Sequence, residues 1–164
     1  MTVRPVTPAD VDVVVGLVRE LADYEKSLDE ARMTCEQLHE ALFGDSPALF
    51  GHVATDRAGT VVGFALWFSN FSTWRGTHGV YLEDLYVSPA ARGTGLGREL
   101  LRTLADVCVQ RGYSRLEWSV LDWNTPSIEF YEAAGAVPMD EWTVFRLTDD
   151  ALTAFAAATR GSSR

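Results

Sequence analysis

The chain has 164 residues, 47% of them hydrophobic and 23% charged, which suits a single folded domain with a sizeable core. A net charge of −9 argues against nucleic acid as the main partner and favours a small cationic substrate. No apolar run reaches the roughly 20 residues that a membrane-spanning helix needs, so we expect no membrane partner. With no secretory signal after Met1, and with Cys35 and Cys108 isolated from each other, we expect a cytoplasmic protein.

Apolar periodicity, capping residues and turn residues predict the following elements in the N-terminal half. They are a strand at 2–5, a helix from 8 to about 26 capped by Thr7 with Asp10, a helix at about 34–43, strands at 49–54 and 60–69 joined by a hairpin at 56–59, and a loop at 70–79.

The same signals predict the elements of the C-terminal half. They are a strand at 80–87, a helix from about 95 to 111, a strand at 115–121, a helix at 124–134, a strand at 142–147, a short helix after Thr148, and a frayed tail at 161–164. A helix between two consecutive strands implies a right-handed crossover and a parallel pair. We therefore expect one α/β domain over residues 1–160.

A glycine-rich turn follows the strand at 80–87. Its sequence, Arg92-Gly93-Thr94-Gly95-Leu96-Gly97, delivers three glycines at alternate positions just before an apolar helix. Glycine lets the backbone approach a ligand, and the first amides of a helix have no partner within it. Such amides form a site for an anion such as a pyrophosphate. The turn lacks the Lys-Ser or Lys-Thr of a Walker A loop, and its glycine spacing does not match the dinucleotide fingerprint.

A second polar face follows the strand at 115–121. Asn124, Ser127 and Tyr131 lie at i, i+3 and i+7 of the predicted helix and so share one side of it. Taken singly, Asn124 is also a typical helix N-cap and Tyr131 a typical half-buried aromatic. Because ligands in open α/β sheets bind at the carboxyl ends of parallel strands, we expect this face and the glycine turn to meet at one site.

Over nearly its full length the chain resembles the GCN5-related N-acetyltransferase (GNAT) superfamily, and within it the diamine, spermidine/spermine-type, acetyltransferases. The stretches that carry the resemblance are 20–26 (ELADYEK), 81–85 (YLEDL), 92–97 (RGTGLG) and 122–131 (DWNTPSIEFY). The resemblance implies a mixed, mostly antiparallel central sheet with its fourth and fifth strands parallel and splayed around the cofactor. It also implies acetyl-CoA as the acetyl donor, direct transfer to an amine, no metal, and a homodimer.

The resemblance also assigns residues to the cofactor. The backbone of Leu85, Tyr86 and Val87, helped by a bulge in the strand, would meet the pantetheine arm and the acetyl carbonyl. The pyrophosphate would bind at Arg92, Gly93, Thr94, Gly95, Leu96, Gly97 and Arg98. Asn124 and Ser127 would line the other side, and Tyr131 would protonate the departing thiolate.

Glu83 is the expected general base, acting through water, because an alkylammonium must lose a proton before its nitrogen attacks a thioester. We expect Asp84 to lie on the opposite face of the strand unless a bulge intervenes, and so not to share this role. By resemblance, the amine site also includes Tyr24, Glu25, Glu117, Trp118, Ser119 and Asp140. Two departures from the family pattern are Glu132-Ala133-Ala134, where relatives carry basic residues, and a short segment before Trp142 that affects the assignment of Asp140.

The acceptor is expected to be a primary amine of a small cationic molecule such as a polyamine or diamine. Thialysine or another lysine analogue, an amino sugar and a protein N-terminus are alternatives. A non-catalytic acyl-CoA sensor would need the glycine turn but neither Glu83 nor Tyr131.

Overall fold

The computed structural model describes residues 1–158, which fall into two compact units, one from Met1 to Trp123 and one that begins at Asn124. The elements of the first unit are β1 (Thr2–Pro5), α1 (Val11–Tyr24) after a 3-10 turn at Pro8–Asp10, α2 (Cys35–Phe43), β2 (Phe50–Thr55), β3 (Val61–Ser72), β4 (Thr77–Val87), α3 (Leu96–Arg111) and β5 (Leu116–Glu117). The second unit contains α4 (Thr125–Ala133) and α5 (Asp149–Ala158). The predicted tail at 161–164 lies outside the described residues. No helix in the described chain is both long and apolar enough to cross a membrane.

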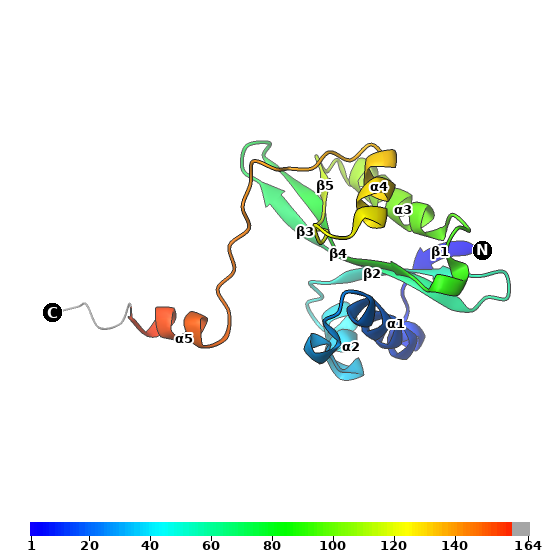
Figure 1. Ribbon diagram of the computed structural model, residues 1–164, viewed down its shortest axis with the longest axis horizontal. Coiled ribbons are helices and arrows are strands. Elements are labelled where there is room, and N and C mark those ends of the chain that lie inside the picture. The colour runs from blue at the N-terminus through cyan, green and yellow to red at the C-terminus, as the bar shows by residue number, and fades with distance from the viewer. Residues whose placement is uncertain (159–164) are drawn as a thin grey trace. The chain divides into compact units, whose positions relative to one another are not determined.

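The five strands form one mixed sheet in the order β1-β2-β3-β4-β5 (Figure 1). The first three pairings are antiparallel, and β4 and β5 are parallel. The α/β class, the mostly antiparallel sheet and the parallel pair of fourth and fifth strands are therefore confirmed.

Helices cover both faces of this sheet, α1 and α2 on one side and α3 on the other (Figure 1). Alternation along β3 supplies both layers, because successive side chains of a strand point to opposite faces. Phe64 and Leu66 pack with Val14 of α1 and Leu38 of α2 in one fully buried cluster. On α3, the leucines spaced three and four residues apart are buried, as the predicted helical stripe requires.

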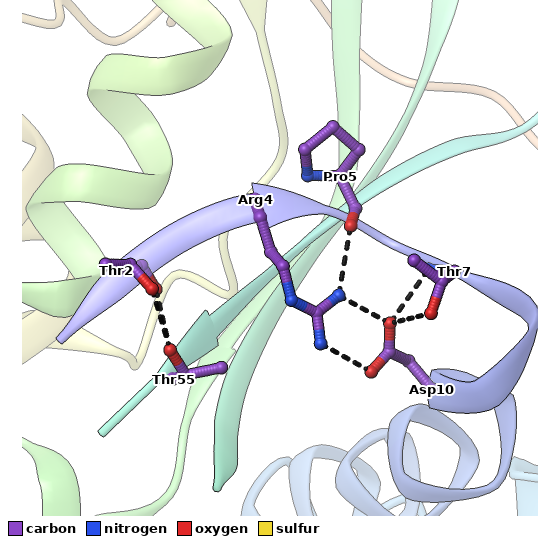
Figure 2. A network of polar contacts seen from close by, with 6 residues as sticks. All are labelled: Thr2, Arg4, Pro5, Thr7, Asp10 and Thr55. Atoms are coloured by element: carbon purple, nitrogen blue, oxygen red, sulfur yellow. Dashed lines mark hydrogen bonds and ion pairs between the residues drawn. The ribbon is translucent and has the colours of Figure 1, made fainter. Parts of the chain in front are cut away.

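The start of α1 is fixed by a buried carboxylate. Figure 2 shows Asp10 accepting two hydrogen bonds from the Arg4 guanidinium, at 2.7 and 2.8 Å, and two more from the backbone amide and hydroxyl of Thr7. The Arg4 hydrogen bonds, followed by those from Thr7, hold the pKa of Asp10 well below its usual range despite the opposing effect of burial. The predicted cap is thus confirmed, and Arg4 of β1 is an additional partner that the sequence pattern did not indicate.

We expect Asp10→Ala to lower the free energy of unfolding by about 2 kcal/mol at pH 7, because it removes a buried carboxylate that accepts four hydrogen bonds at the start of α1. A group with a lowered folded-state pKa stabilises the fold above its unfolded pKa, near 3.8, and loses that effect as the pH falls toward its folded value. The gap between variant and wild type in urea unfolding should therefore narrow below about pH 4. Asp45→Asn, at an exposed loop position, is the control, and an equal loss in both variants would contradict the assignment.

The predicted loop at 70–79 is wrong. β3 continues to Ser72 and β4 begins at Thr77, so the two strands form one long hairpin with Phe71 paired to His78. The rings of these two residues lie 5.0 Å apart in an edge-on contact, and the turn is closed by the Gly76 amide, which donates to Ser72 O. Cross-strand pairing of this kind stabilises a strand that the sequence pattern alone does not indicate.

Two predicted strands of the C-terminal half are corrected. The strand expected at 115–121 is reduced to the two residues of β5. The strand expected at 142–147 is wrong, since no strand is assigned there in the described chain. Val144 and Phe145 are 81% and 91% exposed. Alternating apolar residues favour a strand, but a strand also needs a ladder partner for its backbone groups.

Candidate functional site

The parallel ladder between β4 and β5 is short and leaves part of β4 beyond it. It joins Val80 to Leu116 and Tyr81 to Glu117, whereas β4 continues to Val87 along β3. The β5-facing edge of β4 from Leu82 onward thus extends past the ladder. Unpaired strand edges offer backbone donors and acceptors to a ligand. The predicted backbone positions Leu85, Tyr86 and Val87 lie on this stretch.

The glycine turn leads directly into α3, as expected. Gly93 and Gly95 have φ values of +75° and +88°, and a Cβ atom built at either would meet nothing within 4 Å. The glycines are therefore needed for their left-handed backbone and not for lack of room. Gly95 is the N-cap of α3 and supplies no side chain to its first amides. Those amides, at Leu96, Gly97 and Arg98, can bind an anion.

Arg92 lies across the end of β4. Its Nε donates to the Val87 carbonyl oxygen at 3.0 Å, and its guanidinium carbon lies 5.2 Å from the Tyr24 ring and 5.5 Å from the Tyr86 ring. Glu20 of α1 accepts hydrogen bonds from Tyr86 Oη and Ser88 Oγ on the same side. The end of α1 is therefore bound to the base of the glycine turn, and Tyr24, an expected amine-site residue, lies beside Arg92.

A bulge interrupts β4 at the expected base. Leu66 pairs with Asp84 and Trp67 pairs with Leu82, so Glu83 is the extra residue of β4. The bulge interrupts the regular alternation of faces along β4. That alternation was the reason for not expecting Asp84 to share the role of base with Glu83. Glu83 is exposed and Asp84 half-buried.

Asp84, Glu83 and Glu25 form an acidic group. Burial, followed by the negative charges of Glu83 and Glu25, raises the pKa of Asp84 to about 6. Burial also raises the pKa of Glu25. A carboxylate with a pKa near neutrality, next to two others, attracts a cation and can exchange a proton with it. Asp84 is thus a functional candidate that the sequence pattern did not favour, because regular alternation along the strand places it on the face opposite Glu83.

The amine-site candidates around β5 have partners within the sheet. Glu117 forms an ion pair with Arg115 at 2.8 Å and accepts a hydrogen bond from Asn70 Nδ2 at 2.8 Å. The Ser119 hydroxyl lies 2.9 Å from Tyr81 Oη, and Trp118 is half-buried. The contacts of Glu117 thus join the end of β5 to Arg115 and to Asn70 of β3.

The remaining predicted site residues belong to the second unit. Asn124 is the N-cap of α4, accepts from the Ser127 amide and is buried. Tyr131 is half-buried near the end of α4, with its ring centroid 5.2 Å from that of Phe130. Asp140 is exposed. Among the described residues, no three His, Cys, Asp or Glu side chains form a group that could hold a metal ion.

Comparison with known proteins gives a consistent result. The profile of the acetyltransferase (GNAT) family matches residues 17–136. The chain is 35% identical over 160 residues to a thialysine N-epsilon-acetyltransferase of Bos taurus, covering 92% of this chain and 94% of the relative. It is 43% identical over 94 residues to an L-ornithine N5-acetyltransferase of Arabidopsis thaliana, covering 57% of this chain and 41% of that protein.

Solved structures agree with the family match. An integron cassette protein from the mobile metagenome of V. cholerae is 26% identical, with a TM-score of 0.79 over 94% of this chain and 96% of that one. An aminoglycoside acetyltransferase from a soil metagenome shares the fold at 15% identity, with a TM-score of 0.76 over 91% of this chain and 96% of that one. With a family match over residues 17–136, a glycine turn at the start of α3 and a strand edge that extends past its parallel partner, the chain belongs to the acetyltransferase (GNAT) family.

Proposed function

We propose that this protein transfers the acetyl group of acetyl-CoA to a primary amine at the end of a short alkyl chain, as in a diamine, a polyamine or a lysine-like amino acid. The observation that carries the proposal is the acidic group of Glu25, Glu83 and Asp84, two of which lie on the stretch of β4 that extends past its parallel partner. The relatives named for acetylating thialysine and ornithine support an amine acceptor. Acetyl-CoA would supply the acetyl thioester. The residues of the chain would bind and orient the two substrates and transfer protons.

The residues of the glycine turn fit the diphosphate of acetyl-CoA. The amides of Leu96, Gly97 and Arg98 at the α3 N-terminus would hold its oxygens, with open space at Gly93 and Gly95 for the close approach. Thr94 and Arg98 would add side-chain contacts, whereas Arg92 would fix the turn to Val87. A backbone amide on β4 between Leu85 and Val87 would donate a hydrogen bond to the acetyl oxygen. This bond would lower the activation free energy by about 3 kcal/mol. Asn124 and Ser127 would line the opposite side.

Proton transfers would involve three side chains. The ammonium of the substrate would be attracted by Asp84 and Glu25, and Glu83 would accept its proton through a water molecule. Tyr131 Oη would hold the proton that the leaving sulfur takes. Tyr24, Trp118 and Ser119 would line the amine site, and Glu117 and Asp140 would contribute negative charge at its margin.

A thiol-release assay on the purified full chain with acetyl-CoA tests this function. The panel contains diamines and polyamines, ornithine, lysine and thialysine, and aminoglycosides. We expect thiol release with short primary amines, at a rate that falls as the pH is lowered, because the small fraction of unprotonated amine decreases further. Tight binding of acetyl-CoA with no thiol release in the presence of any amine would favour the alternative, an acyl-CoA sensor.

We also propose a single acetyltransferase domain over residues 1–160 that acts in the cytoplasm, supported by a family match that runs from residue 17 to 136 and by two free cysteines. Cell fractionation with an antibody to the chain would test the compartment.

A homodimer is proposed as well, formed through the C-terminal residues. Its support is a run of large apolar side chains with high exposure, among them Val137, Val144 and Phe145 at 76%, 81% and 91%. Exposed apolar surface of this kind marks contact sites.

We expect sedimentation equilibrium to give twice the chain mass of 18.1 kDa. Phe145→Ser should weaken self-association by about tenfold or more, because it removes a large apolar contact. Val109→Ser, at an exposed position on α3, is the control. A monomeric wild type at high concentration would contradict the proposal.

A further inference from the structure

Lys26 occupies a backbone conformation that normally favours glycine. It follows the end of α1, where its amide donates to Asp23 O at 3.0 Å and the next amide, of Ser27, donates to Ala22 O at 2.8 Å. This is the hydrogen-bond pattern of a Schellman cap, whose central residue is left-handed. Lys26 has a φ of 60°, which costs a residue with a Cβ atom stability that glycine would not lose. It is also the only lysine in the chain.

The Lys26 ammonium lies over an exposed aromatic ring. Its Nζ is 5.1 Å from the centroid of Trp123, which is 49% exposed and in turn lies 6.1 Å from the Tyr24 ring. Tyr24 is the residue beneath the Arg92 guanidinium. Within the described part of the chain the ammonium forms no ion pair, so its charge can act on a bound molecule.

This cation is fixed beside groups of opposite charge. Glu25 precedes it and belongs to the acidic group with Glu83 and Asp84. Lys26 also lines a hollow of about 550 Å³ together with Asp23, Ser27, Leu28, Asp29 and Glu30. One ammonium among several carboxylates complements a molecule that carries both charges, such as the α-amino acid end of a lysine-like substrate. For a diamine or polyamine, the same ammonium repels the second positive charge.

We infer that Lys26 determines acceptor specificity by favouring amines that carry a carboxylate over amines that do not. The left-handed cap and the Trp123 ring hold its ammonium where it attracts that carboxylate. The inference rests on the proposed function and goes beyond it, because it selects among the amine classes that the proposal leaves open.

Matched substrate pairs test the inference. Ornithine and putrescine, and lysine and cadaverine, differ only in the carboxylate. The measured quantity is the ratio of kcat/KM for the amino acid to kcat/KM for its decarboxylated partner. We expect Lys26→Met to lower this ratio about fivefold and Lys26→Glu about twentyfold. Lys26→Arg keeps the charge and the ring contact, and should keep the ratio within about twofold.

Arg57→Met is the control variant, because it removes one positive charge from the exposed turn between β2 and β3. It should leave the ratio unchanged. Lys26→Gly provides a second variant with a relaxed backbone. It should lower the ratio as Lys26→Met does, while raising the melting temperature.

The outcomes separate the two claims. If the wild type acetylates both members of a pair and Lys26→Met gives the same ratio as Arg57→Met, the role of Lys26 is overturned while the proposed function stands. If the wild type acetylates no amine of either class, the proposed function fails and the inference fails with it. A Lys26→Gly protein that melts below the wild type would overturn the claim that Lys26 is kept at a cost to stability.

Discussion

Tyr131→Phe lowers kcat by about 10²-fold and leaves the KM for acetyl-CoA within about twofold, if Tyr131 Oη supplies a proton in the transition state. The substitution removes one oxygen from a half-buried side chain on α4, and the ring that packs against Phe130 is retained. An alkyl thiolate is a poor leaving group without a proton donor, so the loss should fall on turnover. The measurement is steady-state kinetics with a saturating amine across pH 6 to 9.

The control for Tyr131→Phe is Tyr113→Phe. Tyr113 is also half-buried and polar at its tip, but it lies after α3 and contacts the Arg111 guanidinium. That variant should keep wild-type turnover. Equal activity of Tyr131→Phe and the wild type at every pH would remove Tyr131 from the chemistry.

Asp84→Asn makes the protein more stable and much less active. A folded-state pKa of about 6, raised from 3.8 chiefly by burial, means that the folded protein binds the proton more tightly than the unfolded chain. Stability therefore falls as the pH rises from about 4 to about 6, and the loss persists above that range. The difference corresponds to at most about 3 kcal/mol at pH 7. An uncharged amide recovers part of it, and the variant should melt higher than the wild type at pH 7.5 but not at pH 4.5.

The activity of the same variant separates the roles of two neighbouring carboxylates. We expect Asp84→Asn to raise the KM for the amine about tenfold or more, because the acidic group loses its least exposed charge. Glu83→Gln should instead lower kcat and move the rate profile to higher pH, without a gain in stability. If Glu83→Gln leaves the profile in place and Asp84→Asn moves it, Asp84 and not Glu83 is the base.

Local chemistry explains which parts of the fold could be predicted from the sequence. The cap at Thr7 and the glycines before α3 act within a few residues, so neighbouring positions in the sequence are enough to predict them. The long hairpin of β3 and β4 depends on pairs such as Phe71 with His78, which only the folded chain brings together. The strand predicted at 142–147 is absent for a related reason. The segment has the alternating apolar residues of a strand, but its own sequence does not show whether another strand is there to pair with it.

The same distinction applies to the site. The glycine turn before α3 could be predicted from the spacing of its residues, whereas Tyr24 entered only through the family resemblance. The raised pKa of Asp84 could not be predicted, because it arises from burial in the folded chain and from the charges of Glu83 and of Glu25, which is distant in the sequence. Lys26 was likewise missed, since a lysine after a helix looks like a solvated end charge until its φ and its contact with Trp123 are known.

The bulge in β4 also affects how this enzyme can change over evolutionary time. Glu83 is the extra residue of the bulge and has no paired residue on β3. Strand pairing therefore places no demand on its side chain. A substitution at Glu83 can therefore change the chemistry of the site while the neighbouring pairs between β3 and β4 are retained. A lineage can thus alter its chemistry at this position without first securing extra stability elsewhere.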